Sequence, residues 1–399
     1  MAYVSKASDS LGGTAGGAGL VQQAYDRLLE FALRSEPLIR SVADKTPARQ
    51  SIPGSTVVLQ KYVDLAQNTT ALTETTDPDA VAMSTPTTVS ITLNEYGNSV
   101  LVTRALELFS LADVDPAIAN IIAYNLADSI DAVAMETLRG GSNVIYSGAT
   151  ATSTVTVAAA ATIDSADIRR AIAKLRSAKA VARKGSLYWA GIHPEVSHDL
   201  RAESSSGQGW LLPNQYGSSQ DRIWAGEIGN YEGAFYIESP RLYSAKDGAN
   251  QSTLATTAVT VAGTSAGFTF GVASSAVIAT RAEVGDLING TGIATNAVIS
   301  AISTSGSTTT FTVATANTAA VTATTVVTVT PKTRVFRSII CGQQAMAQAV
   351  AEEPHVVIGP VVDRLMRHRP MGWYGVLGFA RYREEALYRI ESGSSIAAL

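Results

Sequence analysis

The clearest apolar pattern in the chain predicts a long helix over residues 116–139. Its apolar stripe recurs every three to four residues and consists of Ile118, Ile122, Leu126, Ile130 and Val133. Asp115 suits the N-cap position and Pro116 the first helical position. Gly140 and Gly141 then end the helix. At 1.5 Å per residue its length is about 36 Å, so it can brace a whole domain.

Shorter periodic segments predict further elements. Helices are expected from residue 20 to Pro37, from residue 165 to 178 behind the N-cap Asp164, and over HPEVSHDLRAE (193–203) and GQQAMAQAVAEE (342–353). Buried strands are expected over SLYWAGI (186–192), AFYIE (234–238) and VFRSIIC (335–341). A Thr/Ala-rich β stretch precedes residue 165, and residues 371–392 are β again. Helices and strands thus follow one another as in an α+β fold.

A long two-stranded ribbon is predicted between residues 57 and 104. VVLQKYV (57–63) and TVSITLNEYGNSVLVTR (88–104) have the composition of strands, and the polar segment 66–86 between them is too long for a tight turn. An isolated hairpin is only marginally stable in water. The ribbon therefore needs another surface to lie on.

The composition changes abruptly between residues 250 and 330. The charged residues there are Arg281, Glu283 and Asp286, whereas Thr, Ala, Ser, Val and Gly dominate. Short β runs separated by turn residues indicate a small β-sandwich or barrel. Because the surrounding sequence resumes at Thr333, the segment is interpreted as an inserted domain whose ends lie close together.

Composition excludes several classes of protein. With 399 residues, two or three folding units are expected. The net charge of −4 gives no basis for gripping nucleic acid by its phosphates. The one cysteine, Cys341, lies in an apolar run and is expected to be a buried hydrophobe. A secretory signal and a membrane-spanning stretch are not expected, so the protein is expected in a reducing, aqueous compartment.

Candidate catalytic and metal-binding patterns are weak. Residues 263–267 match the G-x-S-x-G nucleophile motif around Ser265, but their flanks are β rather than strand and helix. His193 and His198 are five residues apart, whereas zinc-binding helices use four, so His193 is expected to end a strand or cap a helix. The acidic residues Glu74, Asp77 and Asp79 fall on the exposed ribbon tip and are expected to be solvated.

Basic residues concentrate near the C-terminus. They are Arg364, Arg367, His368, Arg369, Arg381, Arg383 and Arg389. They could face a nucleic acid or an acidic neighbour. They could equally form ion pairs within the chain, because Glu384, Glu385 and Glu391 are close in sequence. Both interpretations remain open at this point.

Four segments resemble a known family of proteins. They are AYDRLLEFAL (24–33), GIHPEVSHDLR (191–201), WAGEIGNYEGAFYIESP (224–240) and GWYGVLGFARYREEALYRIES (372–392). In this order they resemble the major capsid proteins of tailed bacteriophages with the Hong Kong 97-like fold, in particular the coat proteins of the phage N-four group. The resemblance implies a structural, non-enzymatic protein of the virion capsid, assembled in the host cytoplasm without a cofactor.

The resemblance also implies a division of the chain. Residues 1–54 would be an N-terminal arm with a short helix, and 55–104 an extended loop reaching over an adjacent subunit. The peripheral domain would comprise 105–164 and 361–399, with the spine helix 116–139. The axial domain would comprise 165–245 and 333–360. The inserted β-sandwich-like domain, 246–332, departs from the simplest members and would project from the outer surface.

Partners and contacts follow from the same resemblance. The subunit would form pentamers and hexamers that enclose double-stranded DNA, touching it non-specifically, with scaffolding, portal and decoration proteins as further partners. Candidate assembly contacts are Lys61, Tyr62, Glu74, Asp77, Arg104, Arg364, Arg367, Arg369 and Trp373. Some members of the fold cross-link Lys to Asn, but here no motif identifies a partner for Lys61.

Two rival functions remain testable from the sequence. A serine hydrolase using Ser265 predicts labelling by an active-site serine reagent and loss of that labelling in Ser265→Ala. A secreted, Thr-rich adhesin predicts an export signal.

Overall fold

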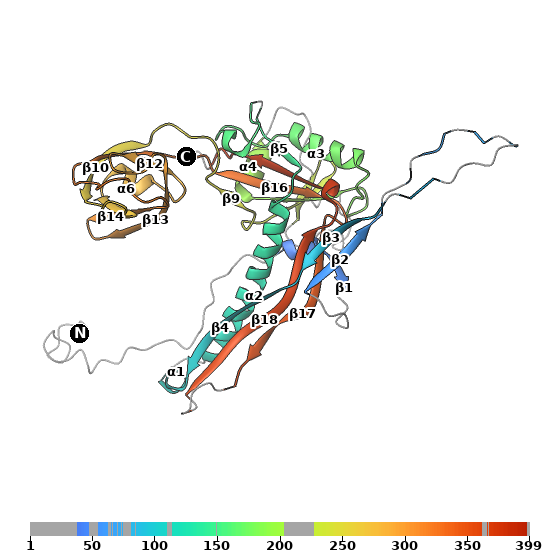
Figure 1. Ribbon diagram of the computed structural model, residues 1–399, viewed down its shortest axis with the longest axis horizontal. Helices are drawn as coiled ribbons and strands as arrows, with labels where there is room; N and C mark the ends of the chain where they lie inside the picture. The colour runs from blue at the N-terminus through green and yellow to red at the C-terminus, as the bar shows by residue number, and fades with distance from the viewer. Residues whose placement is uncertain are drawn as a thin grey trace, which may run out of the picture. The chain divides into compact units, whose positions relative to one another are not determined.

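A computed structural model describes residues 38–47, 55–62, 65, 67–69, 71–72, 74, 81–83, 85–109, 114–148, 150–202, 227–360, 365 and 367–396 (Figure 1). The chain divides into two compact units. The first comprises 1–34, 95–128 and 352–376, and the second comprises 35–94, 129–351 and 377–399. The helix expected from residue 20 to Pro37 lies outside the described residues.

Five helices are described, and α2 begins at Val114, one residue before the predicted N-cap Asp115. They are α1 (Arg104–Phe109), α2 (Val114–Arg139), α3 (Ser165–Ser177), α4 (Pro194–Ala202) and the short α6 (Val277–Arg281). The predictions for α2, α3 and α4 are confirmed. Asp164 caps α3 by accepting a hydrogen bond of 2.8 Å from the backbone N–H of Asp167. The Thr/Ala-rich stretch before α3 is not β: it contains a 3-10 turn, Thr154–Thr156.

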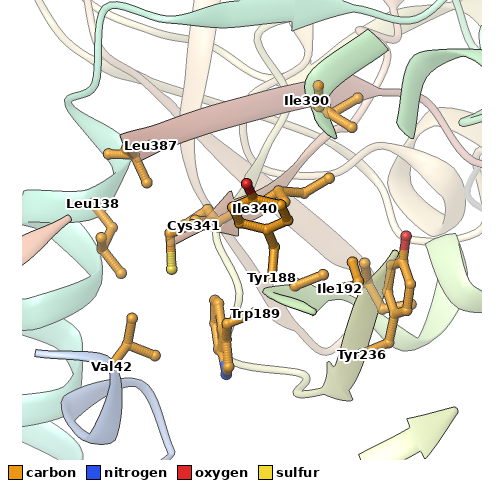
Figure 2. Packing of buried hydrophobic residues seen from close by; sticks show 14 of the residues in the cluster. Val42, Leu138, Tyr188, Trp189, Ile192, Tyr236, Ile340, Cys341, Leu387 and Ile390 are labelled. Carbon is orange, nitrogen blue, oxygen red and sulfur yellow. The ribbon is translucent and has the colours of Figure 1, made fainter. Parts of the chain in front are cut away.

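A mixed sheet holds the main core. Its strands are β5 (Val144–Tyr146), β6 (Tyr188–Ile192), β7 (Glu227–Tyr231), β8 (Ala234–Glu238), β9 (Ser244–Ala245), β16 (Val335–Cys341) and β19 (Leu387–Ser392). The order is β5-β19-β16-β6-β8-β7, with β9 paired to β16. Trp189, Tyr236, Ile340 and Cys341 are buried in this core (Figure 2). The predicted strands β6, β8 and β16 are therefore present and buried.

The C-terminal strand is an interior member of this sheet. β19 lies between β5, to which it is parallel, and β16, to which it is antiparallel. From the sequence, residues 361–399 were grouped with the spine helix rather than with β16. β19 and β16 are nevertheless neighbours in one sheet, so that sheet includes strands from both groups of residues.

A second sheet has the order β1-β17-β18-β4. Its strands are β1 (Asp44–Pro47), β17 (Met346–Ile358), β18 (His368–Arg381) and β4 (Asn94–Thr103). Beside it β2 (Thr56–Lys61) and β3 (Thr87–Thr92) form the antiparallel pair called the ribbon below. The single long strand expected over 88–104 is in fact two, since β3 ends at Thr92 and β4 begins at Asn94.

The helix predicted over residues 342–353 is wrong. From Met346 this segment is strand β17, and Met346, Ala347, Gln348 and Ala349 are all buried. Alanine and glutamine favour helices in isolation. Here the small alanine side chains allow Ile91 of the ribbon to pack against the strand. Tertiary packing therefore overrides the local preference.

Residues 255–330 form a closed barrel, with the short helix α6 between β11 and β12 in the chain (Figure 1). The strands are β10 (Ala255–Val261), β11 (Thr269–Ala273), β12 (Leu287–Gly290), β13 (Ala297–Ser305), β14 (Thr308–Val313) and β15 (Val326–Thr330). Phe270 and Phe311 face each other across β11 and β14, with ring centroids 6.1 Å apart. The apolar core of the barrel shares no residue with the core of the main sheet. Of the two predicted forms, the structure has the barrel.

The segments that enter and leave the barrel pair with each other. The backbone N–H of Gly248 donates to the carbonyl of Thr333 at 3.1 Å, and that of Gln251 donates to the carbonyl of Pro331 at 2.8 Å. The ends of the barrel domain therefore lie together, as expected of an insertion.

Phe311→Ala should destabilise the barrel by about 3–5 kcal/mol, because it leaves a cavity in a fully packed core. Hydrogen exchange should show faster exchange in the barrel strands while β6, β8 and β16 keep their protection. The matched variant Phe235→Ala, in the main core, should give the reverse pattern. Equal loss in both regions would show that the two cores unfold together.

Candidate functional site: surfaces available for assembly

The unit formed by residues 95–128 and 352–376 has a small apolar core. Its buried members are Val102, Ile122, Met371 and Trp373, with Tyr96, Ile118 and Leu126 packed against them. Its exposed large apolar residues are Val100, Leu101, Leu108, Ile121, Val356, Val357, Ile358 and Leu365. Within the described residues, this unit thus exposes more large apolar side chains than it buries. A surface of this kind marks a site of contact with other proteins.

The end of β17 is the most open part of this unit. Val356, Val357 and Ile358 are 40%, 39% and 56% exposed. Successive side chains of a strand point to opposite faces, so neither face of the sheet is covered there. β1 pairs with β17 at residues 347–350, and among the described residues no strand continues that pairing to 358. Exposed apolar side chains of this kind favour contact with another protein.

The ribbon is supported on one face by its own chain. Ile91 is fully buried, with Val57 and Leu59 beside it, against Ala347 and Ala349 of β17. The prediction that the ribbon needs a surface to lie on is confirmed at its root, although that surface is intramolecular.

The other face of the ribbon and the segment beyond it are uncovered. Val58 is 55% exposed, and Tyr62, Leu65, Leu72, Val81 and Met83 are exposed to a similar or greater extent. Glu74 is exposed as well. The described residues of this segment therefore make little contact with the rest of the subunit, which leaves them available to a partner.

Lys61 joins the root of the ribbon to the C-terminal segment. Its ammonium group lies 2.9 Å from the carboxylate of Glu385. The hydrogen bond from Lys61 holds the pKa of Glu385 below its ordinary value. Tyr382 adds a weaker bond of 3.4 Å from its hydroxyl to the carbonyl of Gln60. Lys61, a predicted assembly contact, thus has a partner in its own chain.

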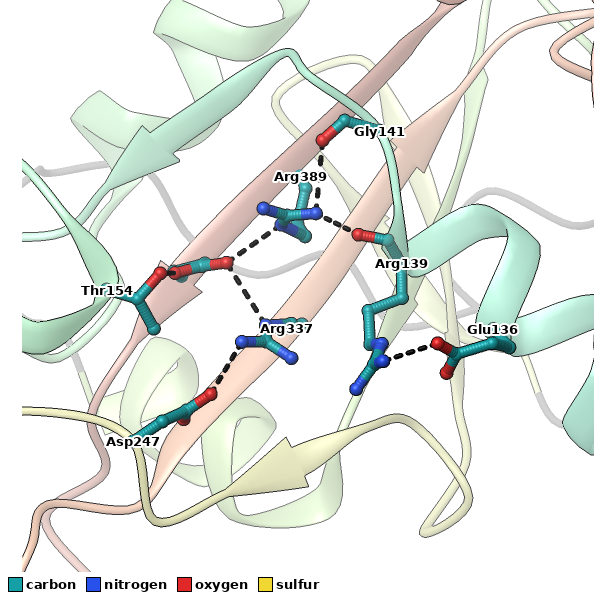
Figure 3. Close-up of polar contacts among 8 residues, drawn as sticks. Glu136, Arg139, Gly141, Thr154, Asp247, Arg337 and Arg389 are labelled. Atoms are coloured by element: carbon teal, nitrogen blue, oxygen red, sulfur yellow. Dashed lines mark hydrogen bonds and ion pairs between the residues drawn. The ribbon is translucent and has the colours of Figure 1, made fainter.

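Two arginines hold the C-terminal end of α2. Arg381 donates to the carbonyl of Thr137 at 2.9 Å, and Arg389 donates to the carbonyls of Arg139 and Gly141 (Figure 3). The last carbonyls of a helix have no partner within it and carry partial negative charge. Arg381 of β18 and Arg389 of β19 donate hydrogen bonds to those carbonyls and place positive charge beside them.

A buried carboxylate organises the charges around Arg389. Glu391 is fully buried, and its Oε1 lies 2.8 Å from Arg389 Nε and 3.1 Å from Arg337 Nε (Figure 3). Its Oε2 accepts a hydrogen bond of 2.6 Å from Thr154. Arg337 also binds Asp247 at 2.7 Å. The Glu391 carboxylate thus joins β19 to β16 and to Thr154, and Arg337 extends this network to Asp247.

The C-terminal basic concentration therefore splits between the two interpretations. Arg381 and Arg389 form ion pairs within the chain, with Glu384 and Glu391 respectively. The ion-pair interpretation holds for these two. The carbonyl of Arg367 accepts a hydrogen bond of 2.8 Å from the backbone N–H of Arg104.

The remaining predicted contact residues lie in several places. Trp373 is buried and donates from its indole to Asn125 at 2.9 Å, so it belongs to the core of its own unit. Arg104 is exposed, and Arg369 is partly exposed on β18. Asp77 and Arg364 lie outside the described residues. What the sequence did not indicate is the apolar edge 356–358, although the run of three apolar residues was visible there.

The patterns considered for enzymes do not form sites. Ser265 lies between β10 and β11, and a strand rather than a helix follows it. His193 precedes α4, and its Nδ1 accepts a bond of 3.3 Å from the backbone N–H of Glu195, as predicted for a capping residue. Burial raises the pKa of the Cys341 thiol to about 12, so it is an unreactive core residue.

Metal-binding clusters and membrane-spanning helices are both absent from the described residues. In the part of the chain that the structure describes, no three His, Cys, Asp or Glu residues are grouped as a metal ion would require. The helices among the described residues are too short or too polar to cross a membrane.

Glu391→Gln should destabilise the subunit by about 3–5 kcal/mol, because it leaves Arg337 and Arg389 buried beside a neutral group. Urea denaturation of the dissociated subunit measures the change. Glu385→Gln, which breaks the largely exposed pair with Lys61, should cost no more than about 1 kcal/mol. Equal effects of the two variants would contradict the structural role of the buried carboxylate.

Glu384 predicts a pH dependence. Burial raises its pKa, but bonds from Ser142 and Arg381 outweigh this, and the pKa lies below its ordinary value of 4.5. A lowered pKa in the folded state means that the ionised form stabilises the fold above the ordinary pKa. That stabilisation is lost as the pH falls through the lowered value.

The unfolding free energies of wild type and Glu384→Gln should therefore differ at neutral pH and converge below about pH 4. Glu136→Gln, which breaks an exposed pair with Arg139, serves as the control and should change the unfolding free energy at neutral pH by no more than about 1 kcal/mol. A Glu384→Gln difference that persists at low pH would overturn the assignment.

Comparisons with known proteins agree with this picture of a structural subunit. Residues 40–394 match the family described as phage capsid protein. No curated protein sequence shows significant similarity to the chain.

Solved structures with the same fold are similar over nearly the whole chain. The capsid of Ralstonia phage GP4 matches with a TM-score of 0.61 at 13% identity, covering 96% of this chain and 97% of that one. The capsid of the cyanophage P-SCSP1u matches with a TM-score of 0.56 at 11% identity and 96% coverage of both chains. The capsid of Helicobacter pylori bacteriophage KHP30 gives 0.54 at 13% identity, covering 94% and 96%.

The family match spans most of the chain, and the α+β fold is that of Hong Kong 97-like capsids. The chain therefore belongs to the phage capsid protein family, as a structural major capsid protein of the virion head.

Proposed function

We propose that this major capsid protein builds its shell from rings of five and six copies that close into an icosahedral head around double-stranded DNA. The observation that carries the proposal is the imbalance in the unit formed by residues 95–128 and 352–376, whose exposed apolar residues outnumber its buried ones. Copies of the same chain are the partners that a symmetric shell supplies. Each copy covers the apolar edge of the next.

The ribbon and its tip are proposed to lie over an adjacent subunit. Val58 on the outer face and Tyr62 beyond it are exposed, while the inner face is already packed on its own chain. A neighbour that covers the outer face adds apolar contact to the ribbon from outside. Many such contacts, each modest, allow misplaced subunits to leave and still resist the pressure of packaged DNA.

The barrel is proposed to be an inserted domain on the outer surface of the head. Its core is separate from the main core, and its two connecting segments pair with each other. A closed barrel has no free strand edge with which to pair. It can therefore project without cross-linking neighbouring subunits, and it offers a platform for a decoration protein.

Further partners are proposed from the family resemblance. Scaffolding and portal proteins would direct the size and opening of the shell. Contact with DNA would be non-specific and weak, because the chain has a net charge of −4. The segments at 191–201, 224–240 and 372–392 support a placement close to the phage N-four group of coat proteins.

Expression of the full chain, followed by negative-stain electron microscopy and sedimentation, tests the proposal. Hollow particles, rings or tubes of uniform width are expected. A variant with Val356→Asp and Ile358→Asp should remain a folded monomer, because charge on the apolar edge opposes its burial. Val298→Asp, on the exposed barrel surface, is the matched control and should assemble. A wild-type chain that stays monomeric at high concentration would refute the proposal.

A further inference from the structure

A basic cleft lies beside the root of the ribbon. Its volume is about 590 Å³, and its lining includes Lys61, Tyr62, Lys179, Gln344, Arg383 and Glu385. Three of these side chains are cationic and one is anionic. The cleft therefore carries a positive excess on a chain whose net charge is negative.

Two of the cations in the cleft lack full partners. Lys179 is exposed, and its ammonium group forms no hydrogen bond or ion pair in the described part of the chain. The Nε of Arg383 is buried and has no hydrogen-bond partner among the described residues. Burying a charged donor without an acceptor is unfavourable. An anionic group entering the cleft would satisfy both side chains.

The backbone at Lys179 is strained, which is consistent with a functional side chain. Lys179 follows the last turn of α3 with φ of 54°, and the bonds Lys179 N–H to Arg176 O and Ala180 N–H to Leu175 O form a Schellman motif. Glycine is usual at this position because a Cβ is disfavoured there. Gln344, on the same cleft, also has a positive φ, of 59°. Non-glycine residues in such conformations cluster at functional sites.

The chain contains a segment of complementary charge. The ribbon tip, residues 62–86, has four acidic residues and no Lys, Arg or His; they are Asp64, Glu74, Asp77 and Asp79. Its charge of −4 equals that of the whole chain, so the remainder is neutral. Glu74 and its described neighbours 71 and 72 are exposed. The described part of the tip is therefore not docked on its own subunit.

We propose that the basic cleft receives the acidic ribbon tip of a second copy of this chain. The proposal rests on the proposed function and specifies one of its contacts. Carboxylates of the tip would pair with Lys179 and Arg383, while Lys61 keeps its bond to Glu385. Charge complementarity of this kind sets the register between subunits and speeds their encounter.

A charge exchange tests the pairing. The cleft variant carries Lys179→Glu and Arg383→Glu, and the tip variant carries Glu74→Lys, Asp77→Lys and Asp79→Lys. Each alone should raise the protein concentration needed for assembly by roughly tenfold or more, since like charges then meet. The two sets combined in one chain should restore assembly. Arg281→Glu, on the exposed surface of the barrel helix α6, is the matched control and should have no effect.

Lys179→Gly separates assembly from folding. Glycine relieves the strained backbone, so the subunit should be at least as stable to urea as wild type. Assembly should nevertheless weaken, because the cation is lost. A stable variant with unchanged assembly would overturn the proposal.

Carbodiimide cross-linking identifies the two copies. In particles assembled from equal amounts of ¹⁴N and ¹⁵N subunits, cross-links between Lys179 and Glu74 or Asp77 should join light and heavy peptides. Cross-links confined to one isotope would show that the tip docks on its own subunit, against the proposal. If the wild type forms particles and the charge-exchange variants assemble equally well, the cleft contact is refuted and the capsid function stands. If the wild type forms no particles, the capsid function is refuted.

Discussion

The buried carboxylate of Glu391 is the interaction on which the main body of the subunit depends. It binds the arginine that holds the carbonyls at the end of α2, and it also binds Arg337 on the neighbouring strand β16. Helix, sheet and the segment before the barrel are thereby fixed to one another by charge-assisted bonds, which are directional. An apolar core alone would hold the same elements together with less definition of their orientation.

The barrel is a closed sheet, whereas β17 belongs to an open one. The barrel closes on itself through β10, which pairs with both β11 and β15. β17 instead has exposed apolar side chains at residues 356–358, and within the described residues its pairing with β1 covers 347–350. Because a closed barrel offers no free edge to another strand, contact between copies is proposed at the exposed apolar residues of the first unit instead.

Local signals in the sequence were sufficient for some elements and not for others. The caps and stripes of α2, α3 and α4 are local, and these helices were predicted well, as were the buried strands β6, β8 and β16. β17 was mistaken for a helix because alanine favours helices in isolation. Here its small side chain instead leaves room for Ile91 to pack against the strand. The break between β3 and β4 at Leu93 was missed, since the alternation of apolar residues continues through it.

The site was less accessible to prediction than the fold. Lys61 and Glu385 are 324 residues apart in sequence, and Arg337 and Glu391 are 54 apart, so their pairing depends on the topology of the sheets. The concentration of arginines and glutamates near the C-terminus was visible, but which of them pair was not. The apolar run 356–358 was visible in the sequence, whereas its exposure could be seen only in the folded chain.

The position of β19 has a consequence for biosynthesis. This strand occupies an interior place between β5 and β16, so the central sheet cannot be completed until residue 392 has been translated. Its partners in β5 lie 245 residues upstream, so this sheet stays incomplete in a nascent chain until both strands have left the ribosome. A product truncated before this strand would lack an interior member of the main sheet and should remain incompletely folded.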